Sequence, residues 1–447
     1  MDTKAERRER GRRLRANCPR SSQAQCKPRA SGAVALLEES DVGRVEALVP
    51  VKYGRMSHSL FTFFRGSSII QARDLTNTPS SGITVQLCGD CHMLNFGGFA
   101  TPERSLAFDI NDFDETFPGP WEWDVKRLAV SLLLAARDRG FSEETGTTAV
   151  RTAVASYRQH MAEFARETVL ERWYRRIRFE DLLDFFSDNE RAQRTLRKAQ
   201  TRAAKRTSES VFPKLTEVVD GHVKIVDDPP RISHIHKGRP GWEERAADVL
   251  RRYKAASPGD RQQLLERYEL EDTAVKVVGV GSVGTRCFIA LFFANRVEPL
   301  FLQLKEARRS VLESPDGKSR FAHQGQRVVL GQRLMQATSD IFLGWTEVPG
   351  ESDYYVRQLR DMKVSPDFAA FRPQTLVKFG TICGWALARA HARAGDADAI
   401  TGYLGSSDVF DRAAVQYAIA YADQVTRDFA EFEEAIRSGR LPLDIEH

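Results

Sequence analysis

The sequence of 447 residues contains no long apolar run, and its six cysteines follow no regular spacing. Without about twenty consecutive apolar residues, no helix is expected to cross a membrane. The basic N-terminus is followed only by the apolar run 33–37, which is too short for the core of a secretory leader. Irregularly spaced cysteines indicate a reducing compartment in which thiols pack as small apolar groups. These absences predict a cytoplasmic protein without a membrane partner.

Outside the N-terminus the chain has no net excess of positive or negative charge. The net charge is +5, and residues 1–20 alone hold eight Lys and Arg against three Asp and Glu. Since the rest of the chain is formally neutral, nucleic acid is not an expected partner except at this basic segment. The same composition predicts that residues 1–45 form a disordered tail.

Two short polar motifs each follow a predicted strand. A β-branched run leads into residues 88–95, and a second strand-like run leads into residues 111–115. Kinase-type enzymes place a base, an asparagine five residues later and a second aspartate about twenty residues on, to hold magnesium and the acceptor hydroxyl. By this spacing the candidate base is Asp90, and the candidate magnesium ligands are Asn95, Asp112 and Asp114. Because short acidic motifs occur by chance, ordinary turn and cap positions are the simplest alternative.

The first motif also permits two other interpretations. Cys88, Cys91 and His92 form the C-x-x-C-H pattern of covalent c-type haem attachment, and the cysteine pair alone could be half of a redox or zinc site. Haem attachment requires export, for which the sequence has no secretory segment. Zinc would need a second ligand pair, whereas Cys287 and Cys383 stand alone. We therefore rank both below phosphotransfer.

A glycine-rich turn lies in a strand-rich region far downstream. It follows a β-branched run, precedes the apolar run 287–293, and is succeeded by a third run that ends at Lys305. A dinucleotide-binding fold would continue from the last glycine into a helix. A following strand is typical of the kinase loop that covers the nucleotide phosphates, with a lysine on the third strand. A plain hairpin and an edge lysine are the alternatives. The predicted nucleotide-binding residues are Gly279, Gly281, Ser282, Gly284 and Lys305, with Gln358 and Leu359 in a hinge that meets adenine.

The order of these parts is reversed relative to ordinary kinases, because Asp90 precedes the glycine-rich turn. We expect a circularly permuted, kinase-like two-lobed α+β fold, since loops and termini tolerate such rewiring. The expected parts are a catalytic lobe with a helical substrate region at 46–270, an antiparallel-sheet nucleotide lobe at 271–363 and a helical segment at 364–447 that completes the catalytic lobe. Residues 141–270 are expected to build the acceptor pocket.

Several stretches resemble a known family. Residues 63–66, 89–97, 111–115, 123–129 and 325–333 are similar to the bacterial family labelled domain of unknown function 2252, over roughly residues 50–435. This resemblance implies no particular activity.

The metal loops have a second resemblance. Residues 89–95 and 112–114, with Asp124 and Val125, resemble the carboxy lobe of aminoglycoside and choline phosphotransferases. This resemblance implies transfer of a phosphoryl group from ATP, with Mg²⁺, to a hydroxyl of a small molecule. It also implies that Asp124 caps the helix after the metal loop.

The lysine lacks the acidic partner that kinases supply from the following helix. Between Glu306 and Glu347 the only glutamate is Glu313, and the predicted helix at 324–336 offers glutamines. A neutral partner holds a lysine less firmly. A non-catalytic nucleotide-binding sensor or scaffold is therefore the alternative to phosphotransfer, and nucleotidyl transfer is a further alternative. The acceptor and the oligomeric state are left open.

Overall fold

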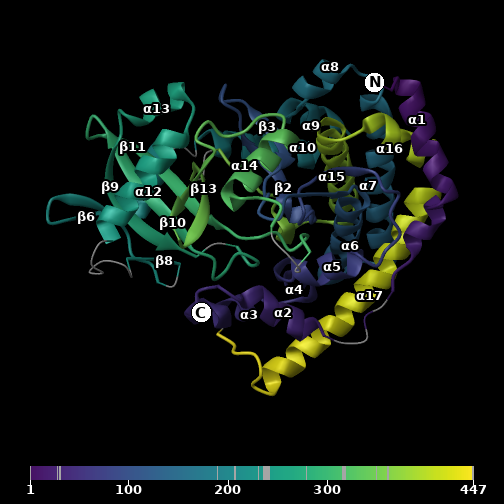
Figure 1. Ribbon diagram of the computed structural model, residues 1–447, viewed down its shortest axis with the longest axis horizontal. Helices are drawn as coiled ribbons and strands as arrows, with labels where there is room; N and C mark the ends of the chain where they lie inside the picture. The colour runs from purple at the N-terminus through teal and green to yellow at the C-terminus, as the bar shows by residue number, and fades with distance from the viewer. Residues whose placement is uncertain are drawn as a thin grey trace.

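The computed structural model describes residues 2–444 except 28, 30, 31, 189, 206, 207, 230, 235–241, 278, 315–318, 349, 360 and 361. Helices dominate, and the strands form antiparallel sheets. Figure 1 shows two bodies side by side, a sheet body on the left and a helical body on the right. The α+β class expected from the sequence is confirmed.

The sheet body is built on six strands in the order β12-β13-β11-β10-β9-β8, each antiparallel to its neighbour. Their bounds are β8 Ile232–Ser233, β9 Glu269–Lys276, β10 Cys287–Ala294, β11 Glu298–Ala307, β12 Gly344–Val348 and β13 Ser352–Gln358. The runs are rich in β-branched and aromatic residues, which favour a pleated, buried surface. Helix α14 (Gln324–Met335) connects β11 to β12 and packs against β12, β13 and the helical body.

Both faces of this sheet are covered by elements that precede β9 in the chain. Helices α12 (Trp242–Ala256) and α13 (Gly259–Leu265) pack on one face, and α11 (Ser208–Leu215) with β6 (Thr216–Val219) and β7 (His222–Ile225) packs on the other. The turn between β6 and β7 has positive φ at Asp220 and Gly221, as a two-residue hairpin turn requires. The sheet body therefore begins before residue 271.

The helical body is organised around long buried helices. Its helices are α6 Glu122–Asp138, α7 Glu143–Phe164, α8 Val169–Tyr174, α9 Phe179–Phe185, α10 Glu190–Ala204, α15 Pro373–Ala394, α16 Ala397–Leu404 and α17 Val409–Arg437. Helices α7 and α15 lie in close contact, because a Cβ atom at Gly384 would come within 2.0 Å of the carbonyl oxygen of Ala153. Within the described ranges, no helix has an apolar stretch of the length that a bilayer crossing requires.

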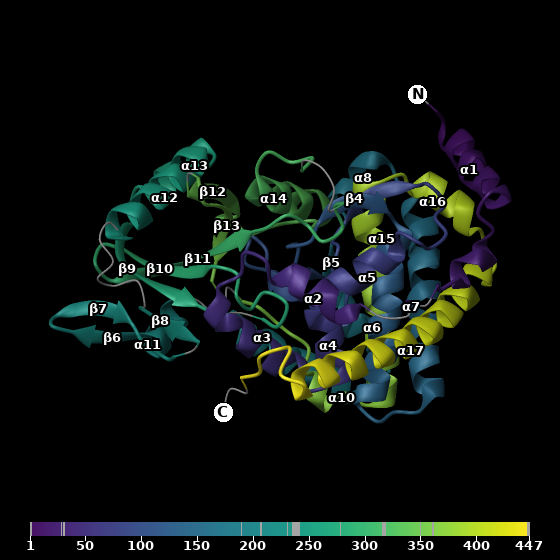
Figure 2. The same ribbon diagram turned by 60° about the horizontal axis from the view of Figure 1, so that its bottom comes forward.

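Short helices and strands lie between these parts (Figure 2). The helices are α2 Ala33–Asp41, α3 Val49–Met56, α4 Leu60–Gly66 and α5 Ser68–Leu75, and the strands are β1 Thr84–Leu87, β2 Phe96–Ala100, β3 Leu106–Ile110, β4 Phe117–Pro120 and β5 Ile177–Arg178. Strand β1 pairs with β4, while β3 pairs with β2 and β5. The strands expected before both polar motifs are thus present.

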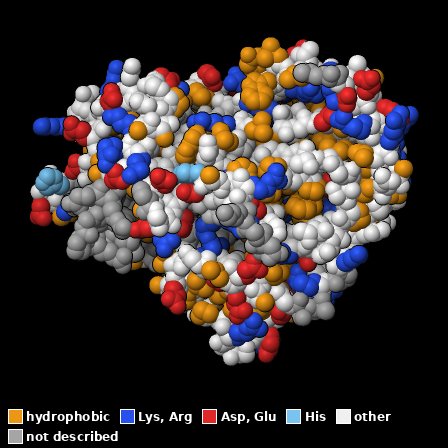
Figure 3. All heavy atoms as spheres, in the orientation of Figure 1, with side chains coloured by type: hydrophobic (Ala, Val, Ile, Leu, Met, Phe, Trp, Pro, Cys, Tyr) orange, Lys and Arg blue, Asp and Glu red, His pale blue; other side chains and the backbone are white. Residues whose placement is uncertain are grey.

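The basic N-terminal segment is helical in the structure. Helix α1 (Lys4–Arg13) packs on α16, where Arg7 and Arg10 form ion pairs of 2.7 Å with Asp398 and Asp396. The charges that predicted a disordered tail over residues 1–45 are used here as long-range partners of acidic side chains. On the face shown in Figure 3, basic and acidic side chains are interspersed.

Candidate functional site

A cavity of about 450 Å³ brings the two polar motifs and the glycine-rich turn together. Its wall includes Asp90, Asn95, Asp112 and Asp114 from the motifs and Gly279, Gly281 and Ser282 from the turn. Segments almost two hundred positions apart in the sequence therefore face one space.

The loop that carries Asp90 is held by a buried carboxylate. Asp124 accepts hydrogen bonds from the backbone N–H of Cys88 (2.8 Å) and of Gly89 (3.1 Å), and His391 Nε2 lies 3.2 Å from the same side chain. Gly89 has φ of +93°, which favours glycine. Asp124 was expected to cap α6, but the N-cap is Trp121 and Asp124 lies in the first helical turn. Its carboxylate oxygens accept hydrogen bonds from the Asp90 loop instead.

The side chain of Asp90 is oriented by Arg127. The Nε and Nη2 atoms of Arg127 lie 2.9 and 2.8 Å from Oδ1 of Asp90, and Arg127 is only 3% exposed. Oδ2 has no hydrogen-bond donor among the described residues, and His92 Nε2 lies 3.8 Å from it. Burial raises the pKa of Asp90, although the guanidinium groups of Arg127 and Arg65 oppose the rise. Burial also lowers the pKa of His92, so this imidazole is neutral.

The candidate metal ligands lie on two loops that are tied together. Asn95 Nδ2 donates to the carbonyl of Asp90 (2.7 Å), and the N–H of Asn111 donates to the carbonyl of Asn95 (2.8 Å). The amide oxygen of Asn95 is thereby the atom left for a cation. Asp112 accepts the N–H of Asp114 (3.2 Å), and burial together with the charge of Asp114 raises the pKa of Asp112.

Lys305 reaches this site through Asp114. It lies on β11 opposite Cys287 and Tyr355, is buried, and forms an ion pair with Asp114. Tyr355 and Ser282 also donate to the Asp114 carboxylate, at 2.7 and 3.2 Å. Burial opposes both charges, but each partner stabilises the other, so the pKa of Asp114 is lowered and that of Lys305 is raised.

The partner of Lys305, left open by the sequence, is thus a residue of the second motif. The helix that follows β11 does not supply it. On α14, Gln332 donates to Gln336, and Gln336 donates to the carbonyl of Ile110. Arg327 of α14 donates to the carbonyl of Asp114 (2.9 Å), which holds the backbone of the motif.

The glycine-rich turn connects β9 to β10 and is fixed through its carbonyl groups. Arg44, Val45 and Arg55 donate to the carbonyls of Val283, Gly284 and Gly279. In the part of the chain that the structure describes, the backbone N–H groups of Gly281 and Ser282 have no acceptor. Gly279 and Gly284 have positive φ. The turn therefore brings free backbone N–H groups to the cavity wall, while its carbonyl groups already accept hydrogen bonds from the protein.

Among the described residues, neither the predicted hinge nor the segment expected to build the acceptor pocket lines this cavity. Gln358 donates its N–H to Asp340 and Leu359 to the carbonyl of Phe301, and neither residue lines the cavity; 360 and 361 lie outside the described residues. No described lining residue comes from 141–270, where the acceptor pocket was expected. The rest of the wall comes from 39–44, 65–73 and 306–313. The basic residues there carried no motif that the sequence could identify, except Arg65.

The cysteine pair beside Asp90 is enclosed. Ligand atoms of Cys88, Cys91 and Asp124 lie within 4.8 Å of one another, but both thiols are 0% exposed. Burial raises the pKa of Cys91 to about 11 and that of Cys88 well above its usual value, so the thiols stay protonated and unreactive. Enclosed thiols do not suit covalent haem attachment, and Asp124 already serves two N–H groups.

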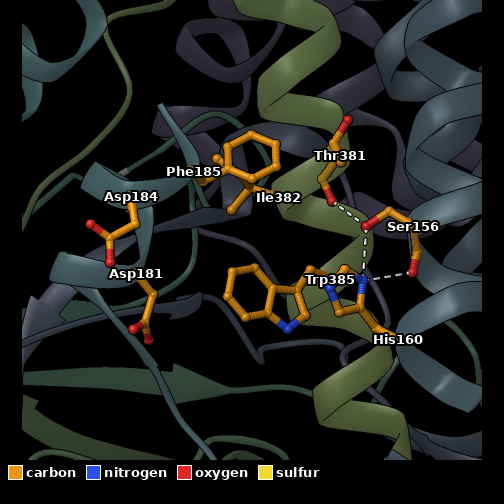
Figure 4. Close-up of a pocket in the computed structure, with 8 residues that line it drawn as sticks. All are labelled: Ser156, His160, Asp181, Asp184, Phe185, Thr381, Ile382 and Trp385. Atoms are coloured by element: carbon orange, nitrogen blue, oxygen red, sulfur yellow. Dashed lines mark hydrogen bonds between the residues drawn. The ribbon is translucent and has the colours of Figure 1, made fainter. Parts of the chain in front are cut away.

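A second cavity, of about 360 Å³, lies on the helical body (Figure 4). Ser156 donates to the carbonyl of Thr381 (2.7 Å), and His160 Nδ1 lies 2.9 Å from the carbonyl of Ser156. Asp181 and Asp184 lie on the opposite side from these two residues, with Trp385 between. Ser156 Oγ also lies 3.2 Å from His160 Nδ1, but both side chains are engaged with backbone groups. Asp181 and Asp184 do not orient the histidine as a hydrolase triad requires.

Comparisons with known proteins agree with the resemblance seen in the sequence. No curated protein and no solved structure matches the chain. The family model described as an uncharacterized protein conserved in bacteria matches residues 44–435. This range contains both polar motifs and the glycine-rich turn. The chain therefore belongs to the bacterial family DUF2252.

Proposed function

We propose that this protein is an ATP- and Mg²⁺-dependent phosphotransferase that acts on a hydroxyl of a small molecule. The observation that carries the proposal is the meeting of Asp90, Asn95 and Asp112 with the glycine-rich turn around one cavity. Phosphoryl transfer needs positioning and charge stabilisation more than covalent chemistry, and this set of groups supplies both.

The oxygen atoms at the cavity suit magnesium. The carboxylate of Asp112 and the amide oxygen of Asn95 are hard ligands, and Asp114 offers a second carboxylate. Bound there, Mg²⁺ would neutralise charge on the nucleotide phosphates. The ionised state of Asp114, favoured by Lys305, supports this assignment.

Asp90 is the proposed base. Arg127 occupies Oδ1, so Oδ2 remains to accept the proton of an acceptor hydroxyl. The fixed loop, anchored by Asp124, holds this oxygen in place without help from the substrate. A base oriented in advance lowers the entropic cost of aligning the acceptor.

Glycine-rich turn, lysine and following helix occur in the order that kinases use for the nucleotide. The turn joins the first two strands of a meander, Lys305 lies on the third, and α14 follows. The free N–H groups of Gly281 and Ser282 suit phosphate oxygens. Lys305 would then exchange Asp114 for a phosphate when nucleotide binds. This topology supports the proposed permuted kinase-like fold.

One observation favours a non-catalytic nucleotide-binding protein. The partner of Lys305 is the candidate metal ligand Asp114, so an ion pair must be broken or shared before magnesium and phosphate are both held. A site that binds nucleotide without turnover would show the same geometry. Nucleotidyl transfer would differ in its product, which carries a nucleotide mass instead of a phosphate mass.

Titration calorimetry with Mg·ATP tests the proposal. Wild type is expected to bind, and Lys305→Met to bind at least about tenfold more weakly, since one charge-assisted phosphate contact is worth about 1.5–3 kcal/mol. Lys198→Met, on the exposed surface of α10, is the matched control and should bind as wild type does. Equal absence of binding in wild type and Lys305→Met contradicts the proposal.

A second variant separates the phosphotransferase from the alternative. Asp90→Asn should retain Mg·ATP binding and lose transfer to a panel of small alcohols, which mass spectrometry of the acceptors would follow. Binding without transfer by wild type across the panel favours the non-catalytic protein.

A further inference from the structure

Arg65 is a cation of the candidate site that forms no hydrogen bond or close ion pair with a described side chain. It belongs to the stretch Phe63-Phe64-Arg65-Gly66 at the end of α4, whose two phenylalanines are buried. Arg65 lines the cavity together with Asp90 and Gly281. The proposed function assigns no role to residues 63–66, although this stretch resembles the family.

The guanidinium of Arg65 makes no hydrogen bond with a described residue, and its buried Nε is unsatisfied. Among the described aromatic side chains it faces the ring of Phe61, whose centre lies 5.9 Å from the guanidinium carbon. Burial lowers the pKa of Arg65, and the nearby Asp90 raises it. The guanidinium nevertheless remains charged, as arginines in proteins do. A partly buried charge without a partner is costly unless a ligand compensates it.

The other arginines of the cavity differ in this respect. Arg73 is paired with Glu39 and Arg309 with Glu313. Arg44 and Arg308 donate to backbone carbonyls. Within the described wall, Arg65 alone is left with its donors available.

The position of Arg65 indicates which anion it would hold. A Cβ atom at Gly281 would lie 3.3 Å from the carbonyl oxygen of Arg65, so the glycine-rich turn rests on the end of α4. The guanidinium of Arg65 also interacts electrostatically with Asp90 and His92. An anion at Arg65 therefore lies between the phosphate-binding turn and the base, where the transferred group must pass.

We propose that Arg65 binds the γ-phosphate of the nucleotide and stabilises the charge on that phosphoryl group during transfer. The inference rests on the proposed function and adds a residue to it. In the step, the bond from γ-phosphorus to the β,γ-bridging oxygen breaks, and a bond to the acceptor oxygen forms. The acceptor's proton goes to Asp90, and ADP leaves with the bridging oxygen. A guanidinium offers several donors in a plane that matches phosphoryl oxygens.

The test compares Mg·ATP with Mg·ADP in wild type, Arg65→Gln and Arg65→Lys by titration calorimetry. Because only ATP has the γ-phosphate, Arg65→Gln should lose about tenfold or more in ATP affinity and keep its ADP affinity. Arg65→Lys should fall between, since it keeps the charge and loses the planar donors. Arg437→Gln, at an exposed position of α17 where the arginine pairs with Glu434, should keep the wild-type ratio. Circular dichroism checks that each variant is folded.

The outcomes separate this inference from the proposal beneath it. If wild type binds both nucleotides and Arg65→Gln keeps the preference for ATP, the role of Arg65 is overturned and the nucleotide site stands. An equal loss for ATP and ADP also overturns it, because Arg65 would then act on the turn or on the other phosphates. If wild type binds neither nucleotide, both inferences fail together.

Discussion

At the scale of single residues, the site depends on side chains that hold the backbone of a loop. Asp124→Asn keeps one acceptor but loses the charge that binds the N–H groups of Cys88 and Gly89. Since charge-assisted hydrogen bonds are worth about 1.5–3 kcal/mol, we expect the free energy of unfolding to fall by about 2 kcal/mol. Hydrogen exchange should rise at residues 88–92. Asp423→Asn, an exposed position on α17, serves as control.

The pKa of Asp90 makes a second prediction at this scale. Burial raises that pKa, and the proposed base must be ionised, so turnover should be present above the pKa and be lost as pH falls through it. The acid limb of the pH profile of kcat/KM for ATP consumption should therefore lie above the range of an ordinary aspartate. Arg127→Gln removes the guanidinium that opposes the rise and should move the limb to higher pH. An unmoved limb in a folded variant would show that Asp90 is not the titrating group.

At the scale of elements, the packing of α7 on α15 has little tolerance. Gly384→Ala places a methyl group 2.0 Å from the carbonyl oxygen of Ala153, so the helices must separate. We expect a loss of about 3 kcal/mol in thermal or urea unfolding. At Gly259 on α13 a Cβ atom would meet nothing within 4 Å, so Gly259→Ala should be neutral or stabilising by up to about 1 kcal/mol. Similar effects at both positions would contradict this description of the interface.

Elements were also the level at which the sequence was most informative. The strands before both motifs and the strands around the glycine-rich turn follow from local patterns of β-branched, apolar and turn residues. The partner of Lys305, the anchoring by Asp124 and the docking of α1 on α16 did not. Each of these contacts joins residues far apart in the chain. The periodicity of apolar residues does not indicate which distant side chain a charged residue will contact. For the same reason, the sequence did not show that the described wall of the cavity would take no residue from 141–270.

At the scale of the whole molecule, the cavity has walls from the sheet body and from the short helices and loops beside it, so a ligand bound there should stabilise these two parts together. At one hundred times its dissociation constant, Mg·ATP should add about 2.7 kcal/mol to the free energy of unfolding. Hydrogen exchange should slow at both 88–95 and 279–286. EDTA should reverse the protection, because the proposed ligands act through the metal. Protection confined to one of these two segments would place the nucleotide elsewhere.

The hydrogen bonds from Arg44, Val45 and Arg55 to the glycine-rich turn also have a kinetic consequence. They attach the turn to the end of α3 and to the segment that joins α2 and α3, so the turn cannot lift without breaking these bonds or taking that part of the chain with it. A ligand beneath the turn would leave only when these hydrogen bonds break or that part of the chain moves with the turn. The residence time of the ligand would then be set by contacts that never touch it.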